Sequence, residues 1–153
     1  MSPVTTETAV EFFGPEWAER ARAAVDAGPD EELRATKLPT YWGWIDNVRA
    51  TYDASWALGV TDLRDDGPVY LKLSWRDGTC HAAEIAGGDV DADYVLSGTL
   101  AVWRDLLGGD DPGRIVMYRR LRLQSGDVLR FFQGIYFFVE SLAAVARVPA
   151  ALP

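Results

Sequence analysis

Few side chains in this sequence could carry nucleophilic or acid–base chemistry. His81 is the only histidine and Cys80 is the only cysteine. Acyl transfer of the serine type needs a base beside the nucleophile, so such a site would depend on where His81 points. A single cysteine excludes an internal disulfide and a metal site built from several cysteines. No Gly-rich phosphate loop, dinucleotide fingerprint or metal-spaced His/Cys cluster occurs. We therefore predict no metal, no cofactor and no assigned catalytic residue.

Closely spaced aspartates are the remaining candidates for general acid–base work. They occur as three groups: Asp65-Asp66, Asp89/Asp91/Asp93 and Asp110-Asp111. All but Asp93 fall at expected turns, where aspartate is common because its side chain bonds the nearby backbone. Asp93 is followed by Tyr94 at the edge of an expected strand. If the protein is an enzyme, the acid–base or orienting groups that we would test are Asp93, Tyr94, Arg119 and Tyr136.

The other chemical feature is the apolar stretch "SGDVLRFFQGIYFF", residues 125–138, which has five aromatic rings in the eight residues from Phe131. If Asp127 caps a helix that runs to about Arg147, that helix has two apolar stripes: Phe131, Ile135, Phe138, Leu142 and Val145, and Phe132, Tyr136, Val139 and Ala143. Charged and polar residues interrupt it too often for a membrane span. A core helix, a homodimer face and the wall of an apolar cavity remain as alternatives.

Composition and charge narrow the class of protein. The 153 residues fit a single domain, residues 1–153, and 48% hydrophobic residues suffice for a core. A net charge of −8 argues against nucleic acid as a partner, and by the same reasoning it disfavours an anionic membrane surface. The acidity is concentrated in residues 1–68, whose net charge is −7. The stretch "MSPVTTETAV" lacks the features of a secretion signal, so we expect a cytoplasmic protein, and its arginine-rich composition suggests a GC-rich, bacterial genome.

Local patterns predict an α+β chain. A helix is expected over residues 15–27, since Pro15 suits a first helical position and Gly28-Pro29 ends the pattern. The segment 30–38 could add a short helix, and "TYWGWID" is too irregular to assign. Alternating residues predict strands from about residue 53, over 69–76 and over 79–85. The Asp77-Gly78 turn should pair Trp75 with Cys80 and Ser74 with His81, which places His81 on the polar side.

The second half of the chain continues the alternation of strands and helices. "ADYVLSG", residues 92–98, predicts a strand that leads into a helix capped by Ser97 or Thr99. Residues 114–123 alternate, so we predict a strand with Ile115, Met117, Leu121 and Leu123 on one face. Arg119 then sits on the apolar side of that strand. It would be paired with an acid such as Asp93, turned outward at a bulge, or directed at an acidic ligand head group.

Several phrases resemble the sterol carrier protein (type 2) domain, a small sterol- and lipid-transfer family. They are "VYLKLSWRDGTCHAAEIAGGDVDADYVLSGTLAVWRDLLGG" and "RRLRLQSGD". The resemblance covers residues 55–138 directly, and the expected first helix also fits the family. The chain departs from the family pattern where Arg119-Arg120 replaces a glycine–lysine pair, and Ser125 looks like an insertion.

The resemblance implies a single-domain, curved mixed sheet of about five strands, covered by helices on one face, with an apolar tunnel between the two layers. The implied ligand is a small hydrophobic molecule, such as a sterol or a fatty acyl chain. By position, the residues that would bind it are Trp103, Leu106, Met117, Arg119, Leu121, Phe131, Phe132, Ile135 and Tyr136.

Two functional hypotheses follow. The first is a non-catalytic module that binds and transfers a lipophile, and the second is a small pathway enzyme, a cyclase, isomerase or hydratase, that uses the same pocket. A homodimer or a partner enzyme is compatible with either hypothesis.

Overall fold

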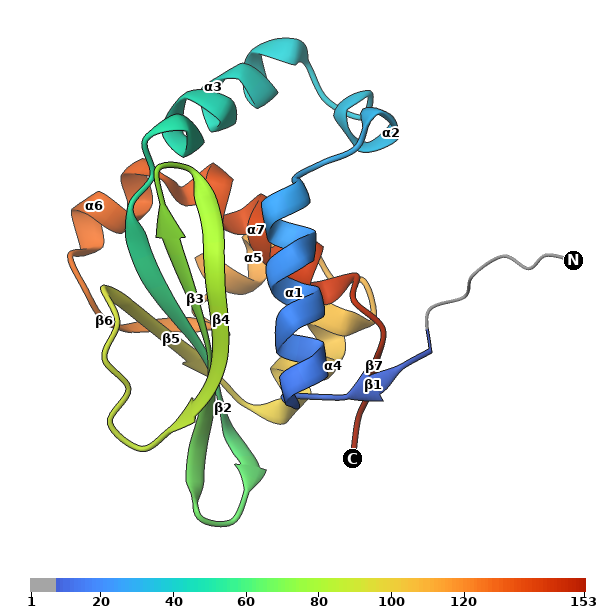
Figure 1. Ribbon diagram of the computed structural model, residues 1–153, viewed down its shortest axis with the longest axis vertical. Helices are drawn as coiled ribbons and strands as arrows, with labels where there is room; N and C mark the ends of the chain where they lie inside the picture. Colours follow the sequence, from blue (N-terminus) through green and yellow to red (C-terminus); the bar gives the residue numbers. More distant parts are fainter. Residues whose placement is uncertain (1–7) are drawn as a thin grey trace, which may run out of the picture.

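The computed structural model describes residues 8–153, and Figure 1 shows their arrangement. The expectation that the chain lacks a secretion signal depends mainly on residues outside this range. A five-stranded mixed sheet has the order β4-β3-β2-β5-β6. Its strands are β2 (Ala54–Arg64), β3 (Gly67–Arg76), β4 (Thr79–Gly87), β5 (Tyr94–Gly98) and β6 (Arg122–Ser125). Only the pairing of β2 with β5 is parallel; the other three pairs are antiparallel.

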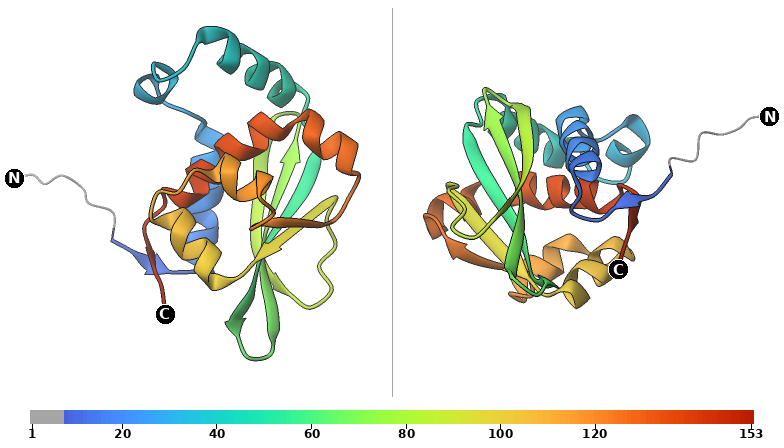
Figure 2. Two further views of the ribbon diagram at one scale, coloured as in Figure 1. Left: turned by 180° about the vertical axis from the view of Figure 1, so that it is seen from behind. Right: turned by 60° about the horizontal axis from the view of Figure 1, so that its bottom comes forward.

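Helices cover one face of this sheet, as Figure 2 shows from two further directions. They are α1 (Pro15–Ala27), α4 (Leu100–Leu107), α5 (Pro112–Met117) and α7 (Ile135–Ala146). Two more helices, α2 (Glu31–Arg34) and α3 (Pro39–Ala50), project from the end of α1, and α6 (Val128–Gln133) precedes α7. Short strands β1 (Val10–Glu11) and β7 (Ala150–Ala151) pair in parallel beside α1. The predicted α+β fold class, with helices on one face of a five-stranded sheet, is confirmed.

The β3–β4 hairpin follows the sequence pattern closely. The side chains of Val69, Leu71, Leu73 and Trp75 are all buried, as their alternation predicts. Asp77 and Gly78 both have positive φ angles, 49° and 77°, which is the geometry of a two-residue hairpin turn. A Cβ atom at Gly78 would lie 2.5 Å from a backbone oxygen, so glycine is required there. Trp75 pairs with Cys80 as predicted.

The predicted pairing of Ser74 with His81 is wrong. Ser74 pairs with Ala82, because the register shifts between Ser74 and Trp75 and leaves one extra residue on β4. His81 is nevertheless exposed. Cys80 is fully buried, and burial raises the pKa of its thiol to about 11.

The strand predicted over residues 114–123 is also wrong. Residues 112–117 form α5, because Pro112 occupies the first turn and the Asp111 side chain accepts a hydrogen bond from the Gly113 N–H. The chain then turns through Arg119, whose φ angle is 59°, and enters the short strand β6. Arg119 is therefore an exposed turn residue and does not lie on the apolar face of a strand.

The single helix expected from Asp127 to Arg147 is divided in two. Asp127 caps α6 as predicted, since its carboxylate accepts a hydrogen bond from the Arg130 N–H. Gly134 ends α6 and begins α7. The first apolar stripe is largely buried, whereas Phe132 and Tyr136 of the second stripe are 41% and 52% exposed. The unassigned segment "TYWGWID" belongs to α3.

Aromatic side chains fill the space between the sheet and the helices. One cluster, at the N-terminal end, consists of Phe12, Phe13, Trp17 and Trp103. A second cluster lies under α7 and consists of Tyr52, Trp56, Trp75, Phe137 and Phe138. All four tryptophans of these two clusters are at most 2% exposed. Residues 8–153 do not show the tunnel that the resemblance implies between the two layers.

Candidate ligand-binding groove

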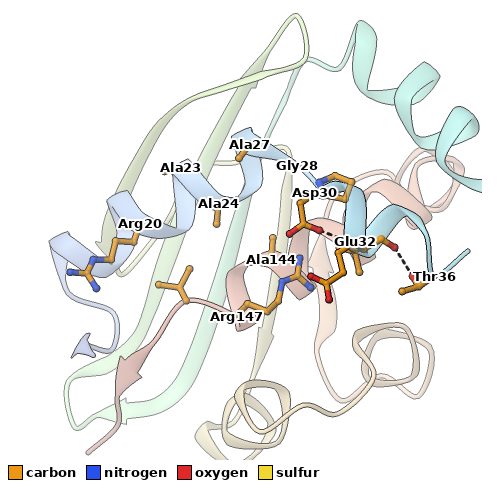
Figure 3. Close-up of a pocket in the computed structure, with 13 residues that line it drawn as sticks. Arg20, Ala23, Ala24, Ala27, Gly28, Asp30, Glu32, Thr36, Ala144 and Arg147 are labelled. Atoms are coloured by element: carbon orange, nitrogen blue, oxygen red, sulfur yellow. Dashed lines mark hydrogen bonds between the residues drawn. The ribbon is translucent and has the colours of Figure 1, made fainter. Parts of the chain in front are cut away.

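A groove of about 790 Å³ lies between α1, α2 and the C-terminal end of α7 (Figure 3). Its size falls within the range of small-molecule sites. Its apolar lining is made mostly of small side chains, contributed by Ala23, Ala24, Ala27, Pro29, Leu33, Ala144 and Val148. The alanines that α1 and α7 contribute are too short to fill this space. We call this feature the α1–α7 groove.

The groove continues into a small, more enclosed cavity beneath α3. This cavity has a volume of about 70 Å³ and shares Ala27, Leu33 and Ala144 with the groove. Larger apolar side chains line its inner part, namely Val25, Trp42, Ile45 and Phe137. The cavity is too small for a lipid chain, so a long ligand could enter it only if α3 moved away from α7.

Polar contacts hold the α2–α3 segment against α7 and the end of α1. The half-buried carboxylate of Glu140 accepts hydrogen bonds from the Tyr41 hydroxyl at 2.6 Å and from the Lys37 ammonium at 2.8 Å. Burial, together with the bond to Glu140, raises the pKa of Tyr41 above its ordinary value. At the other end of α3, Arg49 donates to the backbone oxygen of Asp26 at 2.6 Å. These contacts close the segment over the small cavity.

Charged groups stand at the rim of the groove. Figure 3 shows Arg147, from the end of α7, reaching toward α2. Within residues 8–153, Arg147 forms no ion pair, whereas Arg20 is paired with Glu16. The carboxylate of Asp30 accepts a hydrogen bond from the Leu33 N–H and so caps α2. The rim therefore carries the Arg147 guanidinium and the carboxylates of Asp30 and Glu32 beside an apolar floor, which is an arrangement that suits an amphiphile.

The nine residues predicted to bind ligand lie in two different environments. Four of them are at most 3% exposed: Trp103, Leu106, Leu121 and Phe131. Trp103 also donates a hydrogen bond from its indole nitrogen to the Gly59 carbonyl at 2.9 Å. These four side chains belong to the packed interior, although Leu106 also lines a second surface groove near the C-terminus.

The other predicted residues lie nearer the surface. Ile135 is half-buried, and Met117, Arg119, Phe132 and Tyr136 are exposed. None of the nine lines the α1–α7 groove. Sequence reasoning missed that groove. Alanines of the first helix, "ERARAAVDAG", line the groove, but alanine is favourable in any helix and is no signal of an opening.

Two of the acid–base candidates share a different pocket. Asp93 and Tyr94 line a polar hollow of about 510 Å³ together with Tyr52, Asp127 and Arg130; Arg119 and Tyr136 do not line it. The Asp93 carboxylate accepts hydrogen bonds from the backbone N–H and the hydroxyl of Ser55, so it joins the starts of β2 and β5. Burial is the main cause that raises the pKa of Tyr94. Asp93 thus has a structural role in this arrangement.

Metal-binding clusters and membrane-spanning helices are both absent from the described residues. No three His, Cys, Asp or Glu side chains between residues 8 and 153 are grouped so that they could hold a metal ion. In the same part of the chain, no helix has both the length and the apolar character needed to cross a bilayer.

Comparison with known proteins identifies the fold. No family model matches the sequence, and no curated protein matches it. The crystal structure of sterol carrier protein 2 matches with a TM-score of 0.70 and 22% identity, over 90% of this chain and 99% of that one. A solution structure from Thermus thermophilus, of a conserved hypothetical protein described as possibly a sterol carrier protein, matches with a TM-score of 0.67 and 22% identity, over 96% and 95% of the chains. The chain has the sterol carrier protein 2 fold, and the resemblance seen in the sequence is confirmed at that level.

Proposed function

We propose that this protein binds a hydrophobic ligand, of the sterol or fatty acyl class, in the α1–α7 groove and carries it between donors and acceptors in the cytoplasm. The observation that carries the proposal is an apolar groove of about 790 Å³ on a fold shared with sterol carrier protein 2. Burial of apolar ligand surface supplies the affinity in such a site, and a few polar groups fix the orientation. Arg147 at the rim is the group that would orient a ligand with an acidic end.

Movement of the α2–α3 segment would change the volume that is open to a ligand. Polar bonds around Glu140 join this segment to α7 and Arg49 joins it to α1, while the buried side chains of Trp42 and Ile45 add apolar packing. If these bonds open, the cavity beneath α3 joins the groove, and the two together accommodate a longer chain. Exchange of ligand then depends on movement of a surface segment and leaves the packed sheet and its aromatic clusters undisturbed.

The test is ligand binding by a groove-filling variant. The purified protein is first extracted with organic solvent and its native mass compared with its denatured mass, which reveals a bound lipophile. Binding of a fluorescent fatty acid, such as cis-parinaric acid, is then measured for Ala24→Trp. The bulky ring occupies the groove, so we expect affinity to fall about ten-fold or more, a loss of about 1.4 kcal/mol.

Ala101→Trp is the matched control, because Ala101 is an exposed helical residue of α4 that lines none of the pockets described above. Its affinity should remain within about two-fold of the parent protein. Equal affinity of both variants and the parent would reject the groove as the site. A protein that carries no lipophile and takes up no fatty acid would reject the function itself.

The tunnel wall predicted from the sequence remains the alternative site. It requires helices α4 and α5 to separate from the sheet, because Trp103, Leu121 and three more of its members are at least half-buried. The same assay distinguishes the two sites: Phe132→Ala would weaken binding more than Ala24→Trp if the ligand lay along α6 and α7.

A further inference from the structure

One segment of the chain has a charge opposite to that of the remainder. Residues 112–133 contain five arginines and one aspartate, a net charge of +4. Because the whole chain carries −8, all other residues together carry −12. This segment forms α5, β6 and α6, so the positive charge is gathered on one part of the molecule.

Most of these arginines are not used to stabilise the fold. Arg120 is paired with Asp105 and Asp110. The other four, Arg114, Arg119, Arg122 and Arg130, are exposed and form no ion pair within the described chain. Arg114 lies over the ring of Tyr118 at 5.8 Å, and Arg130 shares its pocket with Asp93 and Asp127, which offset its charge. Of the four, Arg119 and Arg122 have neither an aromatic ring nor a carboxylate as a partner among the described residues.

The same segment, extended by the first turn of α7, exposes large apolar side chains. Six of the eight large hydrophobic residues exposed among residues 8–153 lie between residues 117 and 136: Met117, Tyr118, Val128, Leu129, Phe132 and Tyr136. Leu129 is 72% exposed. Leu129 and Phe132 are spaced by three residues and therefore lie on one side of α6, and Tyr136 lies in the first turn of α7, beyond the break at Gly134. Exposed apolar groups of this size, gathered in one region, indicate a surface that contacts a partner.

These elements occupy one side of the molecule. In the left view of Figure 2, α5, β6 and α6 surround the beginning of α7. A Cβ atom at Gly113 of α5 would lie 3.7 Å from Val139, one turn beyond Tyr136 on α7. We call the exposed arginines and apolar side chains of residues 114–136 the basic aromatic face.

We propose that the basic aromatic face docks this protein on the surface of an anionic phospholipid bilayer. Guanidinium groups attract lipid phosphates, while aromatic and aliphatic side chains enter the boundary between head groups and acyl chains. The acidic residues elsewhere do not prevent this, because physiological salt screens charges beyond about 8 Å. The whole-chain charge, which disfavours an anionic membrane, is thus a poor guide to this surface. The proposal goes beyond ligand binding and holds whether or not the groove is filled.

Vesicle flotation tests the docking. Vesicles of phosphatidylcholine alone are compared with vesicles of phosphatidylcholine and phosphatidylglycerol in equal parts, at physiological and at high salt. Binding should require phosphatidylglycerol and weaken at high salt. In the pair Arg119→Asn/Arg122→Gln, the partition coefficient should fall about 25-fold, at about five-fold for each arginine. Asparagine is chosen at residue 119 because it tolerates a positive φ angle.

The control pair Arg64→Gln/Arg76→Gln removes the same charge from exposed arginines at the ends of β2 and β3, and its partition coefficient should change by less than about two-fold. Leu129→Ser should weaken binding several-fold. Leu38→Ser, which changes an equally exposed leucine at the start of α3, away from α6 in Figure 1, should not. The proposal would be overturned if both arginine pairs lost the same amount of binding, or if the protein bound both kinds of vesicle equally. It would also be overturned if the protein bound a nucleic acid or an acidic protein through this face and did not bind the vesicles.

Discussion

The interior and the α1–α7 groove face the same helices but are built from side chains of very different size. Between the sheet and its covering helices, four buried tryptophans and several phenylalanines fill the interior, and the described residues show no tunnel there. Between α1 and α7, alanines leave a groove of about 790 Å³. Side-chain volume therefore decides where open space remains in this chain.

Two of the buried rings in the interior are packed without a hydrogen bond from their indole nitrogen to any of the described residues. The indole nitrogens of Trp17 and Trp75 are buried without a hydrogen-bond partner in the described part of the chain. An unpaired buried N–H group costs about 1–3 kcal/mol, so the packing of the rings must offset that cost. The groove does not carry this cost, because its floor consists of small apolar side chains and its charged groups lie at the rim, in contact with solvent.

Truncation of an interior tryptophan should have the largest effect. Trp103→Ala removes a fully buried ring and its hydrogen bond to the Gly59 carbonyl. We expect the free energy of unfolding in urea to fall by about 3–5 kcal/mol. Trp44→Ala, at an exposed ring, should cost less than about 0.5 kcal/mol. A loss below about 1 kcal/mol for Trp103→Ala would mean that the interior is loosely filled, and the comparison would fail.

A pH titration sharpens the same contrast. Burial raises the pKa of Tyr52, next to Trp56, to about 12. The folded protein therefore holds this proton more tightly than the unfolded chain, whose tyrosines ionise near pH 10, and stability should decrease as the pH rises from about 10 to 12. The contribution of Tyr52 to this decrease should be about 2 kcal/mol, and it should be absent in Tyr52→Phe. An identical alkaline loss in the variant would show that Tyr52 is not desolvated.

The smallest effect is expected at the edge of the groove. Glu140→Ala removes the acceptor shared by Tyr41 and Lys37, so it should lower the free energy of unfolding by about 1 kcal/mol. Because the α2–α3 segment is then less firmly held, a bound fatty acid should dissociate faster in stopped-flow measurements. Lys37→Gln removes only the more exposed partner and should change stability by less than about 0.5 kcal/mol. Unaltered dissociation in Glu140→Ala would argue that the segment does not control access.

The sequence predicted elements that local rules determine. The β3–β4 turn and the α1 boundaries are confirmed, because each depends on a few neighbouring residues, and of the two cap candidates Ser97 and Thr99 it is Thr99 that caps α4. The alternation of apolar residues over 114–123 predicts a strand, but Pro112 after Asp111 is the better signal, since this pair begins a helix. In α3, aromatic residues occupy both exposed and buried sides, so its periodicity is hidden.

The groove could not be predicted in this way. It is formed where Ala24 of α1 and Ala144 of α7 approach from distant parts of the chain. Alanine in a helix is favourable for its own conformational reasons, so its presence does not indicate an opening. The position of the aromatic residues was equally ambiguous, because the same stretch of α6 and α7 supplies a core residue at Phe131 and exposed side chains at Phe132 and Tyr136.

The most direct measurement of the central claim is photochemical crosslinking of a fatty acid that carries a diazirine, followed by peptide mapping. If the ligand occupies the α1–α7 groove, label will appear in residues 20–36 and 144–148, and Ala24→Trp will abolish it while Ala101→Trp will not. Label confined to residues 103–136, with the groove peptides unmodified, would contradict the account and place the ligand along the aromatic wall.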